Sequence, residues 1–580
     1  MSATENSVGA PVAGADFVIS ALQAEGVHDV FMVPGGHNDP FMAPMVRTSG
    51  LATLVSGFEG GAAYMANGYA LATGGFGVAF GIGGPGILNM ATALASAAAD
   101  RVPLLALSGE VPVAWEGRGG FQSASSPPLD DTAVMSGICS YSARVESPAT
   151  LALHLRSALL TAVSSRSPAH LSIPLDIQQA NVASRWTPLP QELRSPEFLD
   201  ADAMDRVLST VGSTGRTIAI LAGPGLRRNG ETDLADVASK WHIPVATTLG
   251  AKGILPEDHP MSLGVFGYGG SRWATDLIMG PELEILIVIG SALSQRDTMQ
   301  WDRKMLPSQA LVHVDEDPSL LTRAWPDSEV VNGAPAPFLR ALAAADGGVA
   351  RGLESGRSRR KSLLERVQSA GTREYDVDSR SSTSIPLHPA RVIAQARAAF
   401  PRETVAVVDS GAHRAFAAQH WQAYGPREYL SATNIGPMGA AIPLTIGSAA
   451  ARPDVPHLTI TGDGCMLMHG MELHTAVAHR QRMTLLILNN RSYGNIWYRA
   501  HSMGAPESAL TDIDGVDWLA FGRSMGAEGV KVDRPEDLAA AFDAALDSDG
   551  PFVIDARVDK TAVKPTTAWA AAVADWEDND

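Results

Sequence analysis

Short apolar runs alternate with amphipathic stretches along most of the chain. Runs such as 29–33 and 102–108 have the length of strands, whereas 15–25 repeats its apolar positions at the spacing of a helix. The alternation begins again near residue 217 and once more near residue 404. Strands that alternate with helices are typical of parallel α/β sheets. The pattern therefore predicts an α/β protein of three blocks, which we place at residues 1–180, 195–345 and 385–580.

The alternation weakens between residues 346 and 386. This segment is charged, rich in serine and poorly periodic. Charge runs of this kind are typical of a solvated surface. We expect a solvated linker that contains a helix.

A gap in charge interrupts the first block. Residues 60–99 contain no Asp, Glu, Lys, Arg or His. A membrane span needs about 20 unbroken apolar residues, but three glycines and a proline lie between positions 83 and 86. We therefore expect a buried strand at 77–82, a tight turn, and then a buried helix from about residue 87.

The composition excludes several functional classes. A net charge of −18 and a pI near 5.3 argue against a nucleic-acid binder and against attachment to an anionic membrane. Two cysteines, Cys139 and Cys465, cannot form a disulfide framework, so a reducing compartment is favoured. The first ten residues lack the basic and apolar regions of a secretory signal. We expect a cytoplasmic protein that acts on a small molecule.

The strongest chemical signal lies in the last block. A strand at 457–461 runs directly into Gly462-Asp463-Gly464, and a second strand at 483–488 runs into Asn489-Asn490. Polar groups at the carboxyl ends of parallel strands are where open α/β sheets bind ligands. Carboxylate and amide oxygens suit Mg²⁺, and glycines let a diphosphate approach the backbone. The spacing predicts a site for Mg²⁺ and a diphosphate.

Together these features resemble the thiamine-diphosphate-binding motif. The resemblance extends over nearly the whole chain, to the family of acetolactate synthases, pyruvate oxidases, 2-oxo acid decarboxylases and 2-hydroxyacyl-CoA lyases. It implies three doubly wound parallel-sheet domains, of which the first and last bind thiamine diphosphate and the middle one is Rossmann-like. In relatives the middle domain holds FAD, ADP or nothing. The implied Mg²⁺ ligands are Asp463, Asn490 and the backbone carbonyl of Ser492.

The resemblance also implies which residues hold the organic cofactor. Met438 takes the place of the apolar residue that wedges the cofactor into a V shape, and the Gly436 carbonyl would accept a hydrogen bond from its 4′-amino group. The other implied cofactor contacts are Gly411, Ala412, His413, Gly462, Gly464, Cys465, Asn495 and Ile496.

Three residues of the first block are implied in catalysis. Glu59 stands where the family carries the glutamate that hydrogen-bonds the pyrimidine N1′ of the cofactor. Gln122, in the segment Gly-Gly-Phe-Gln, matches a glutamine on the substrate side. His37 is a candidate proton donor, and capping of the neighbouring glycine turn is the alternative for it.

The implied reaction makes or breaks a bond next to a carbonyl. The favoured form decarboxylates a 2-oxo acid and transfers the acyl carbanion to an acceptor carbonyl, as acetolactate synthases do. A 2-hydroxyacyl-CoA lyase, a simple 2-oxo acid decarboxylase, a flavin-linked oxidase and a non-catalytic regulatory subunit are the alternatives. Asn495 and Arg499 depart from acetolactate synthases and suggest a polar or anionic substrate, unless they belong to a solvated loop.

The family resemblance also predicts an assembly. In relatives the glutamate comes from one subunit and the rest of the cofactor site from another. Glu59 and Asp463 lie in different blocks of this chain. We therefore expect a homodimer or homotetramer with active sites at subunit interfaces.

Overall fold

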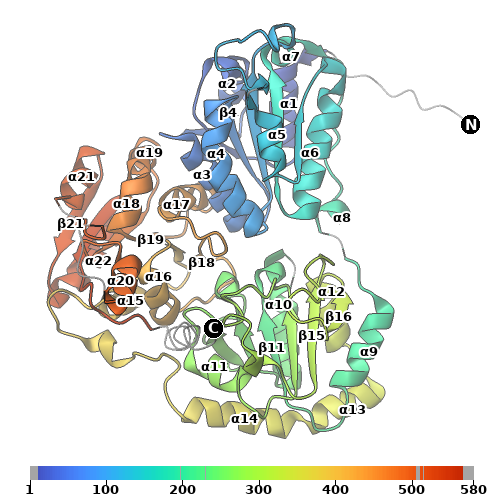
Figure 1. Cartoon of the computed structure of the whole chain (residues 1–580), viewed down its shortest axis with the longest axis vertical. Coiled ribbons are helices and arrows are strands. Elements are labelled where there is room, and N and C mark those ends of the chain that lie inside the picture. The colour runs from blue at the N-terminus through green and yellow to red at the C-terminus, as the bar shows by residue number, and fades with distance from the viewer. Residues whose placement is uncertain are drawn as a thin grey trace, which may run out of the picture.

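A computed structural model describes residues 11–127, 129–195, 197–228, 230–504, 510–513 and 515–565. Three six-stranded sheets, each entirely parallel, form the centres of three domains. In Figure 1 the N-terminal domain lies at the top, the C-terminal domain at the left and the middle domain below. The predicted α/β architecture of three doubly wound domains is confirmed.

The N-terminal sheet has the strand order β3-β2-β4-β5-β9-β8. Its strands are β2 (Asp29–Met32), β3 (Ala52–Val55), β4 (Gly77–Ile82), β5 (Leu104–Glu110), β8 (Tyr141–Arg144) and β9 (Pro168–Pro174). Its helices are α1 (Gly14–Ala24), α2 (Asp39–Arg47), α3 (Glu59–Thr73), α4 (Pro85–Ala99), α5 (Asp131–Ser136), α6 (Leu151–Ser165) and α7 (Leu175–Gln179), and α8 (Gln191–Arg194) follows in the connection to the middle domain. The fully buried strands β4, β5 and β9 run through the centre of this sheet, as expected for strands covered by helices on both faces.

The middle sheet has the order β13-β12-β11-β14-β15-β16, which in chain order is the Rossmann arrangement 3-2-1-4-5-6. Its strands are β11 (Ile218–Ala222), β12 (Val245–Thr247), β13 (Ser262–Val265), β14 (Ile285–Ile289), β15 (Ala310–Asp315) and β16 (Glu329–Asn332). Its helices include α9 (Ala201–Val211), η4 (Pro224–Arg228), α10 (Glu231–Trp241), α11 (Arg272–Ile278) and α12 (Pro335–Ala343).

The C-terminal sheet has the order β18-β17-β19-β20-β22-β21, which repeats the chain order 2-1-3-4-6-5 of the N-terminal sheet. Its strands are β17 (Val405–Val408), β18 (Tyr429–Leu430), β19 (His457–Gly462), β20 (Thr484–Asn489), β21 (Glu528–Val532) and β22 (Phe552–Arg557). Its helices are α15 (Pro389–Ala399), α16 (Ala412–His420), α17 (Ala441–Ala451), α18 (Asp463–His469), η8 (Gly470–Glu472), α19 (Leu473–Ala478), α20 (Gly494–Ser502), α21 (Trp518–Ser524) and α22 (Leu538–Asp547).

The uncharged segment 60–99 folds as α3, β4 and α4, close to the expected strand, turn and helix. Helix α3 crosses α17 of the C-terminal domain at very short range (Figure 1). A Cβ added to Gly68 would lie 2.0 Å from the Leu444 carbonyl oxygen, and one added to Gly447 would lie 1.8 Å from the Met65 oxygen. The small residues are therefore needed for close packing between domains, where only glycine lets two backbones come so near. No described helix is both long and apolar enough to cross a membrane.

The expectation of a solvated linker at 346–386 is wrong in part. Residues 347–369 form two helices, α13 (Gly347–Ser355) and α14 (Arg357–Ser369), that pack against the middle domain. Arg360 is fully buried, and its guanidinium donates to the Trp241 and Leu353 carbonyl oxygens. The prediction failed here because it took a charged residue as a sign of exposure. An arginine can be buried when its guanidinium donates hydrogen bonds to backbone carbonyl oxygens.

Candidate active site

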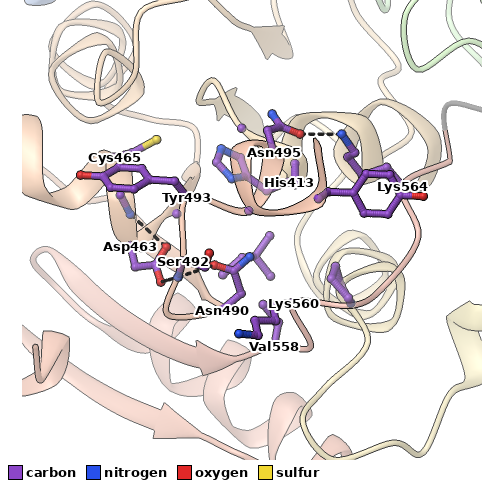
Figure 2. Close-up of a pocket in the computed structure, with 18 of the residues that line it drawn as sticks. His413, Asp463, Cys465, Asn490, Ser492, Tyr493, Asn495, Val558, Lys560 and Lys564 are labelled. Carbon is purple, nitrogen blue, oxygen red and sulfur yellow. Dashed lines mark hydrogen bonds between the residues drawn. The ribbon is translucent and has the colours of Figure 1, made fainter. Parts of the chain in front are cut away.

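The register of two neighbouring strands brings the polar motifs of the C-terminal domain together. Gly462 of β19 pairs with Leu488 of β20, so Asp463 and Asn490 follow at the same edge of the sheet. The Ser492 amide donates to Asp463 Oδ2 at 3.1 Å and to Asn490 Oδ1 at 3.0 Å (Figure 2). The two side-chain oxygens therefore converge on one backbone turn.

The donor set at this turn fits a hard cation. Asp463 is buried, and this burial raises the pKa of its carboxyl to about 6. A divalent cation would reverse that effect by favouring the charged form. Among the described residues no group of three His, Cys, Asp or Glu side chains could hold a metal. A cation here would therefore use Asp463 with amide and carbonyl oxygens and complete its shell from a ligand or water, as Mg²⁺ does.

A cavity of about 240 Å³ opens beside this turn, and all of its lining residues lie between positions 389 and 564. Every C-terminal residue that the sequence implicated in metal or cofactor binding lines it. These residues are Gly411, Ala412, His413, Gly436, Met438, Gly462, Asp463, Gly464, Cys465, Asn490, Ser492, Asn495 and Ile496.

The cavity has the features of a diphosphate cradle. The helices α16, α18 and α20 begin on its wall, and helix N-termini present unpaired N–H groups to anions. A Cβ added to Gly464 would lie 2.8 Å from the Tyr493 ring, so glycine keeps this wall open. Burial lowers the pKa of His413 to about 3, and its Nε2 atom is buried with no hydrogen-bond partner among the described residues. A neutral, unpartnered imidazole can serve a bound ligand.

The three implicated residues of the N-terminal domain lie around one turn, at the carboxyl end of β4. A Cβ added to Gly86 would lie 3.6 Å from Glu59 Oε1, and one added to Gly84 would lie 3.3 Å from the Gln122 carbonyl oxygen. The His37 carbonyl oxygen lies against Gly109, at the end of the adjacent strand β5. None of the three lines the C-terminal cavity. The predicted residues therefore lie in two groups, one in each domain, which we call half-sites.

Glu59 opens α3 and is half-buried. Its Oε2 atom accepts a hydrogen bond from Asn89 Nδ2 of α4 at 2.9 Å. A carboxylate at a helix N-terminus is favoured by the helix dipole.

Comparison with known proteins decides between the families compatible with this geometry. Residues 12–132, 213–342 and 409–556 match the N-terminal TPP binding, central and C-terminal TPP binding domains of thiamine pyrophosphate enzymes. The chain belongs to the thiamine pyrophosphate enzyme family. It is a thiamine-diphosphate-dependent enzyme of the acetolactate-synthase-like group.

Full-length relatives of this thiamine pyrophosphate enzyme support the same assignment. A probable acetolactate synthase large subunit of Methanocaldococcus jannaschii is 28% identical over 95% of this chain and 93% of its own. A putative acetolactate synthase large subunit of Mycobacterium tuberculosis is 29% identical over 95% of this chain and 98% of its own. Acetolactate synthase isozyme 2 large subunit of Escherichia coli is 27% identical over 94% of this chain and 96% of its own.

Two supporting glutamates of this thiamine pyrophosphate enzyme were missed from the sequence. Glu110 is fully buried, and its carboxylate accepts hydrogen bonds from the Val111 and Ala124 amides at 2.7 and 2.9 Å. It thereby holds the loop that carries Gln122. Glu472 holds the loop before Glu59 in the same way. Neither lies in a motif that marks its role: Glu110 binds the Ala124 amide across a loop, and Glu472 binds Ser56 and Gly57, which lie 416 and 415 positions away.

The chain after β22 supplies further missed groups. Lys560 and Lys564 line the cavity together with Tyr493 and Tyr498. Lys564 Nζ donates to Asn495 Oδ1 at 2.8 Å (Figure 2). Trp497, by contrast, is buried and stacks on His501 with ring centroids 5.2 Å apart. Sequence spacing could not have placed the two lysines, because they come from the end of a different strand.

Proposed function

We propose that this chain is a thiamine-diphosphate- and Mg²⁺-dependent carboligase that decarboxylates a 2-oxo acid and transfers the acyl group to an acceptor carbonyl. The observation that carries the proposal is the single cavity in which all thirteen C-terminal residues implicated by the family motifs meet. The names of the relatives support this reaction over a 2-hydroxyacyl-CoA lyase or a simple decarboxylase. A non-catalytic subunit is disfavoured because Glu59, Asp463 and Asn490 are all present.

Each group of the chain has a role in this proposal. Asp463, Asn490 and the Ser492 carbonyl hold Mg²⁺, while the starts of α16, α18 and α20 and His413 take the diphosphate. When bound, thiamine diphosphate supplies a nucleophilic carbon and an electron sink. Met438 would pack against the bound cofactor, and the Gly436 carbonyl would accept a hydrogen bond from its amino group.

The N-terminal residues act on protons and substrate. Glu59 hydrogen-bonds the pyrimidine ring and shares its proton, and Asn89 holds the carboxylate in place. Gln122 borders the substrate. His37 is the proposed proton donor: its Nδ1 atom is buried without a hydrogen-bond partner among the described residues, so a ligand could engage it.

We infer that the donor substrate is anionic. Lys560 and Lys564 bring two cations to the cavity, and Lys564 is directed onto Asn495. Since a 2-oxo acid carries a carboxylate, these cations favour its binding. Lys564→Met should raise the KM for the 2-oxo acid several-fold and leave the affinity for thiamine diphosphate unchanged. An unchanged KM would remove Lys564 from substrate binding.

We propose a homodimer or homotetramer in which two copies complete each site. The C-terminal cavity is lined by residues 389–564, whereas Glu59, Gln122 and His37 lie in the other half-site. Large apolar side chains near Glu59 are exposed in the single chain. They are Val55, Phe58, Leu467, Met468 and Met471, between 42% and 61% exposed. A second copy would cover this surface, which single soluble chains rarely leave open.

The middle domain is the proposed place for FAD or ADP, if either binds. The cavity at the carboxyl edge of its sheet is only about 40 Å³. The Arg101–Asp315 and Arg166–Glu316 ion pairs, at 3.1 and 3.6 Å, cross this edge. The visible spectrum of the purified protein tests the flavin. A cytoplasmic location is proposed from the two cysteines, which are both free.

The test of the function is an assay of the purified protein with thiamine diphosphate and Mg²⁺. A panel of 2-oxo acids is offered with and without a carbonyl acceptor, and CO₂ and the ligation product are measured. We expect CO₂ release and a 2-hydroxy ketone or 2-hydroxy-2-acyl acid, both lost in Glu59→Gln. Full activity of Glu59→Gln would contradict the shared mechanism, and CO₂ release without ligation would favour the simple decarboxylase.

A further inference from the structure

A second, strongly basic cavity lies where the three domains meet. It has a volume of about 350 Å³ and shares no lining residue with the thiamine cavity. Its walls come from the turn after α3, the ends of α4 and α6, the connecting helix α8, η4 of the middle domain and the segment before β18. All three domains and the connection between the first two therefore contribute to it.

Five arginines line this cavity in a chain whose net charge is −18. They are Arg101, Arg166, Arg194, Arg227 and Arg427. Among the described lining residues the only acidic side chain is Asp100. Its carboxylate is already bonded by the Thr433 and Asn434 amides at 3.1 and 3.0 Å. The cavity therefore has a clear excess of positive charge.

Three of the arginines are balanced by acids behind the wall. Arg101 pairs with Asp315 at 3.1 Å, Arg166 lies 3.6 Å from Glu316, and Arg194 pairs with Glu25. These ion pairs offset the charges of three of the five guanidinium groups.

Arg227 and Arg427 are balanced less closely, because Arg427 has only a long ion pair with Glu231 and Arg227 feels Asp100 and Glu231 without an ion pair to either. Arg227 donates to the Tyr429 carbonyl oxygen at 2.9 Å, and Arg427 donates to the Arg227 carbonyl oxygen at 2.7 Å. The nearest carboxylate to Arg427 is that of Glu231, at 3.9 Å. The Nε atoms of both arginines are buried without a hydrogen-bond partner among the described residues. Burial and the neighbouring Arg427 charge lower the pKa of Arg227 to about 10, the direction expected for crowded like charges.

We propose that this cavity binds a phosphate-bearing small molecule, with Arg227 and Arg427 as its principal ligands. A planar guanidinium matches two phosphate oxygens at once, and two such groups side by side suit a dianion. The volume exceeds that of a phosphate ion and falls in the range of small-ligand sites. The anion would relieve the repulsion between the two arginines and tie the three domains together.

This site differs from the smaller cavity at the carboxyl edge of the middle sheet, which is the proposed place for FAD or ADP. That edge is formed by Gly225, Gly290 and Asp315, at the ends of β11, β14 and β15. The two cavities share Asp100, Arg101, Arg166 and Pro224, but only the basic cavity reaches Gly74, α8, Arg227 and Arg427. A Cβ added to Gly74 would lie 2.5 Å from Arg427 Nη2, so the turn after α3 fits closely around this arginine.

The experiment uses the enzyme saturated with thiamine diphosphate and Mg²⁺, so that added anions cannot act through the first cavity. Thermal unfolding is measured against inorganic phosphate, pyrophosphate and ADP, at an ionic strength held constant with chloride. We expect a saturable rise in Tm with at least one of these anions. Arg227→Gln and Arg427→Gln are measured as separate single variants, so that the test still stands if one of them does not fold. Each should weaken binding of the anion at least tenfold. The exposed Arg534→Gln is the matched control and should bind as the wild type does.

The outcomes separate the possible sources of the anion. Binding of phosphate or pyrophosphate that depends on Arg227 or Arg427 supports a phosphate or diphosphate ligand. Binding of ADP alone that depends on these arginines supports a nucleotide whose phosphates lie here. Binding of ADP that both variants retain would place it on the middle-domain edge and overturn the proposal. A rise in Tm that chloride reproduces would overturn it too.

Discussion

Glu472 Oε1 accepts a hydrogen bond from the Ser56 hydroxyl at 2.9 Å, although the two residues lie in different domains. The other carboxylate oxygen accepts from the Gly57 amide at 3.3 Å and from Thr475 Oγ1 at 2.7 Å. Glu472 is buried, and a Cβ added to Gly61 would lie only 2.0 Å from its Oε1 atom. Glu472 of the C-terminal domain therefore holds the loop before Glu59 in place through these hydrogen bonds.

Removal of the Glu472 carboxylate should impair catalysis more than folding. Glu472→Ala leaves the Ser56 hydroxyl and the Gly57 amide without their acceptor, so Glu59 loses its fixed position. We expect kcat to fall at least tenfold, about 1.4 kcal/mol in the barrier, while the affinity for thiamine diphosphate changes less. Steady-state kinetics and cofactor titration measure the two effects. Glu472→Gln keeps one acceptor oxygen and should recover part of kcat; equal loss in both variants would contradict a positioning role.

The proposed metal site predicts an effect of Asp463 on Mg²⁺ dependence. Asp463→Asn removes the only carboxylate of the proposed donor set while keeping its shape. We expect the Mg²⁺ concentration for half-maximal activity to rise at least tenfold, and EDTA to abolish activity of the wild type. Titration of the metal-stripped enzyme measures this change. Asp559→Asn, which also alters a cavity carboxylate, is the control. An equal effect of Asp559→Asn would argue that only the general charge of the cavity matters.

The two half-sites predict complementation between inactive chains. If Glu59 and Asp463 of each site come from different copies, a dimer of Glu59→Gln with Asp463→Ala contains one intact site and one doubly altered site. Random mixing makes half of the dimers mixed, so about a quarter of wild-type activity should return after joint refolding. A mixture that stays inactive, although mass spectrometry finds mixed dimers, would place both residues of a site in one chain.

The meeting of Asp463 and Asn490 at one sheet edge was predictable because both residues come at the ends of strands. Asp463 and Asn490 are fixed by the register of β19 on β20, and the motif spacing contains that register. The fold was predictable for a similar reason, since buried strands and helices alternate at characteristic lengths.

Contacts between domains could not be predicted in this way. Glu472 and Ser56 are 416 positions apart, and neither stands in a pattern that refers to the other. The same holds for the basic cavity, where Arg194, Arg227 and Arg427 meet from a connection and two domains. Arg360 was expected in a solvated segment but is buried. Its burial depends on hydrogen bonds to backbone carbonyl oxygens, which no sequence pattern reveals.

The uncharged segment 60–99 predicts strong intolerance of charge. Ala62 is fully buried in α3, within the core shared with the C-terminal domain. Ala62→Asp would bury a carboxylate without a partner, at a cost of about 3–5 kcal/mol. We expect loss of soluble holoenzyme and of activity together, measured by gel filtration and assay. Ala540→Asp, on an exposed position of α22, is the matched control, and normal assembly of Ala62→Asp would refute this placement.

Burial of His170 predicts a specific loss of stability in acid. Its ring lies in β9 between two hydroxyls, with Nε2 2.8 Å from Ser108 Oγ and Nδ1 3.0 Å from Ser142 Oγ. Burial, and then the charge of Arg144, lower the pKa of His170 to about 3. The unfolded chain takes up the proton near pH 6.5, but the folded chain does not. Stability is therefore present above pH 6.5 and is lost as the pH falls from there toward 3.

The size of this loss can be isolated with one substitution. Each pH unit below 6.5 costs about 1.4 kcal/mol, so the His170 contribution falls by about 2 kcal/mol between pH 6.5 and 5. His170→Asn removes the titrating ring and should be less stable than the wild type at pH 7.5, by a margin that shrinks by that amount at pH 5. Denaturant unfolding at both pH values measures the margin, and His28→Asn, at an exposed position, is the control. A margin that does not change with pH would mean that the folded protein protonates His170 as readily as the unfolded chain does.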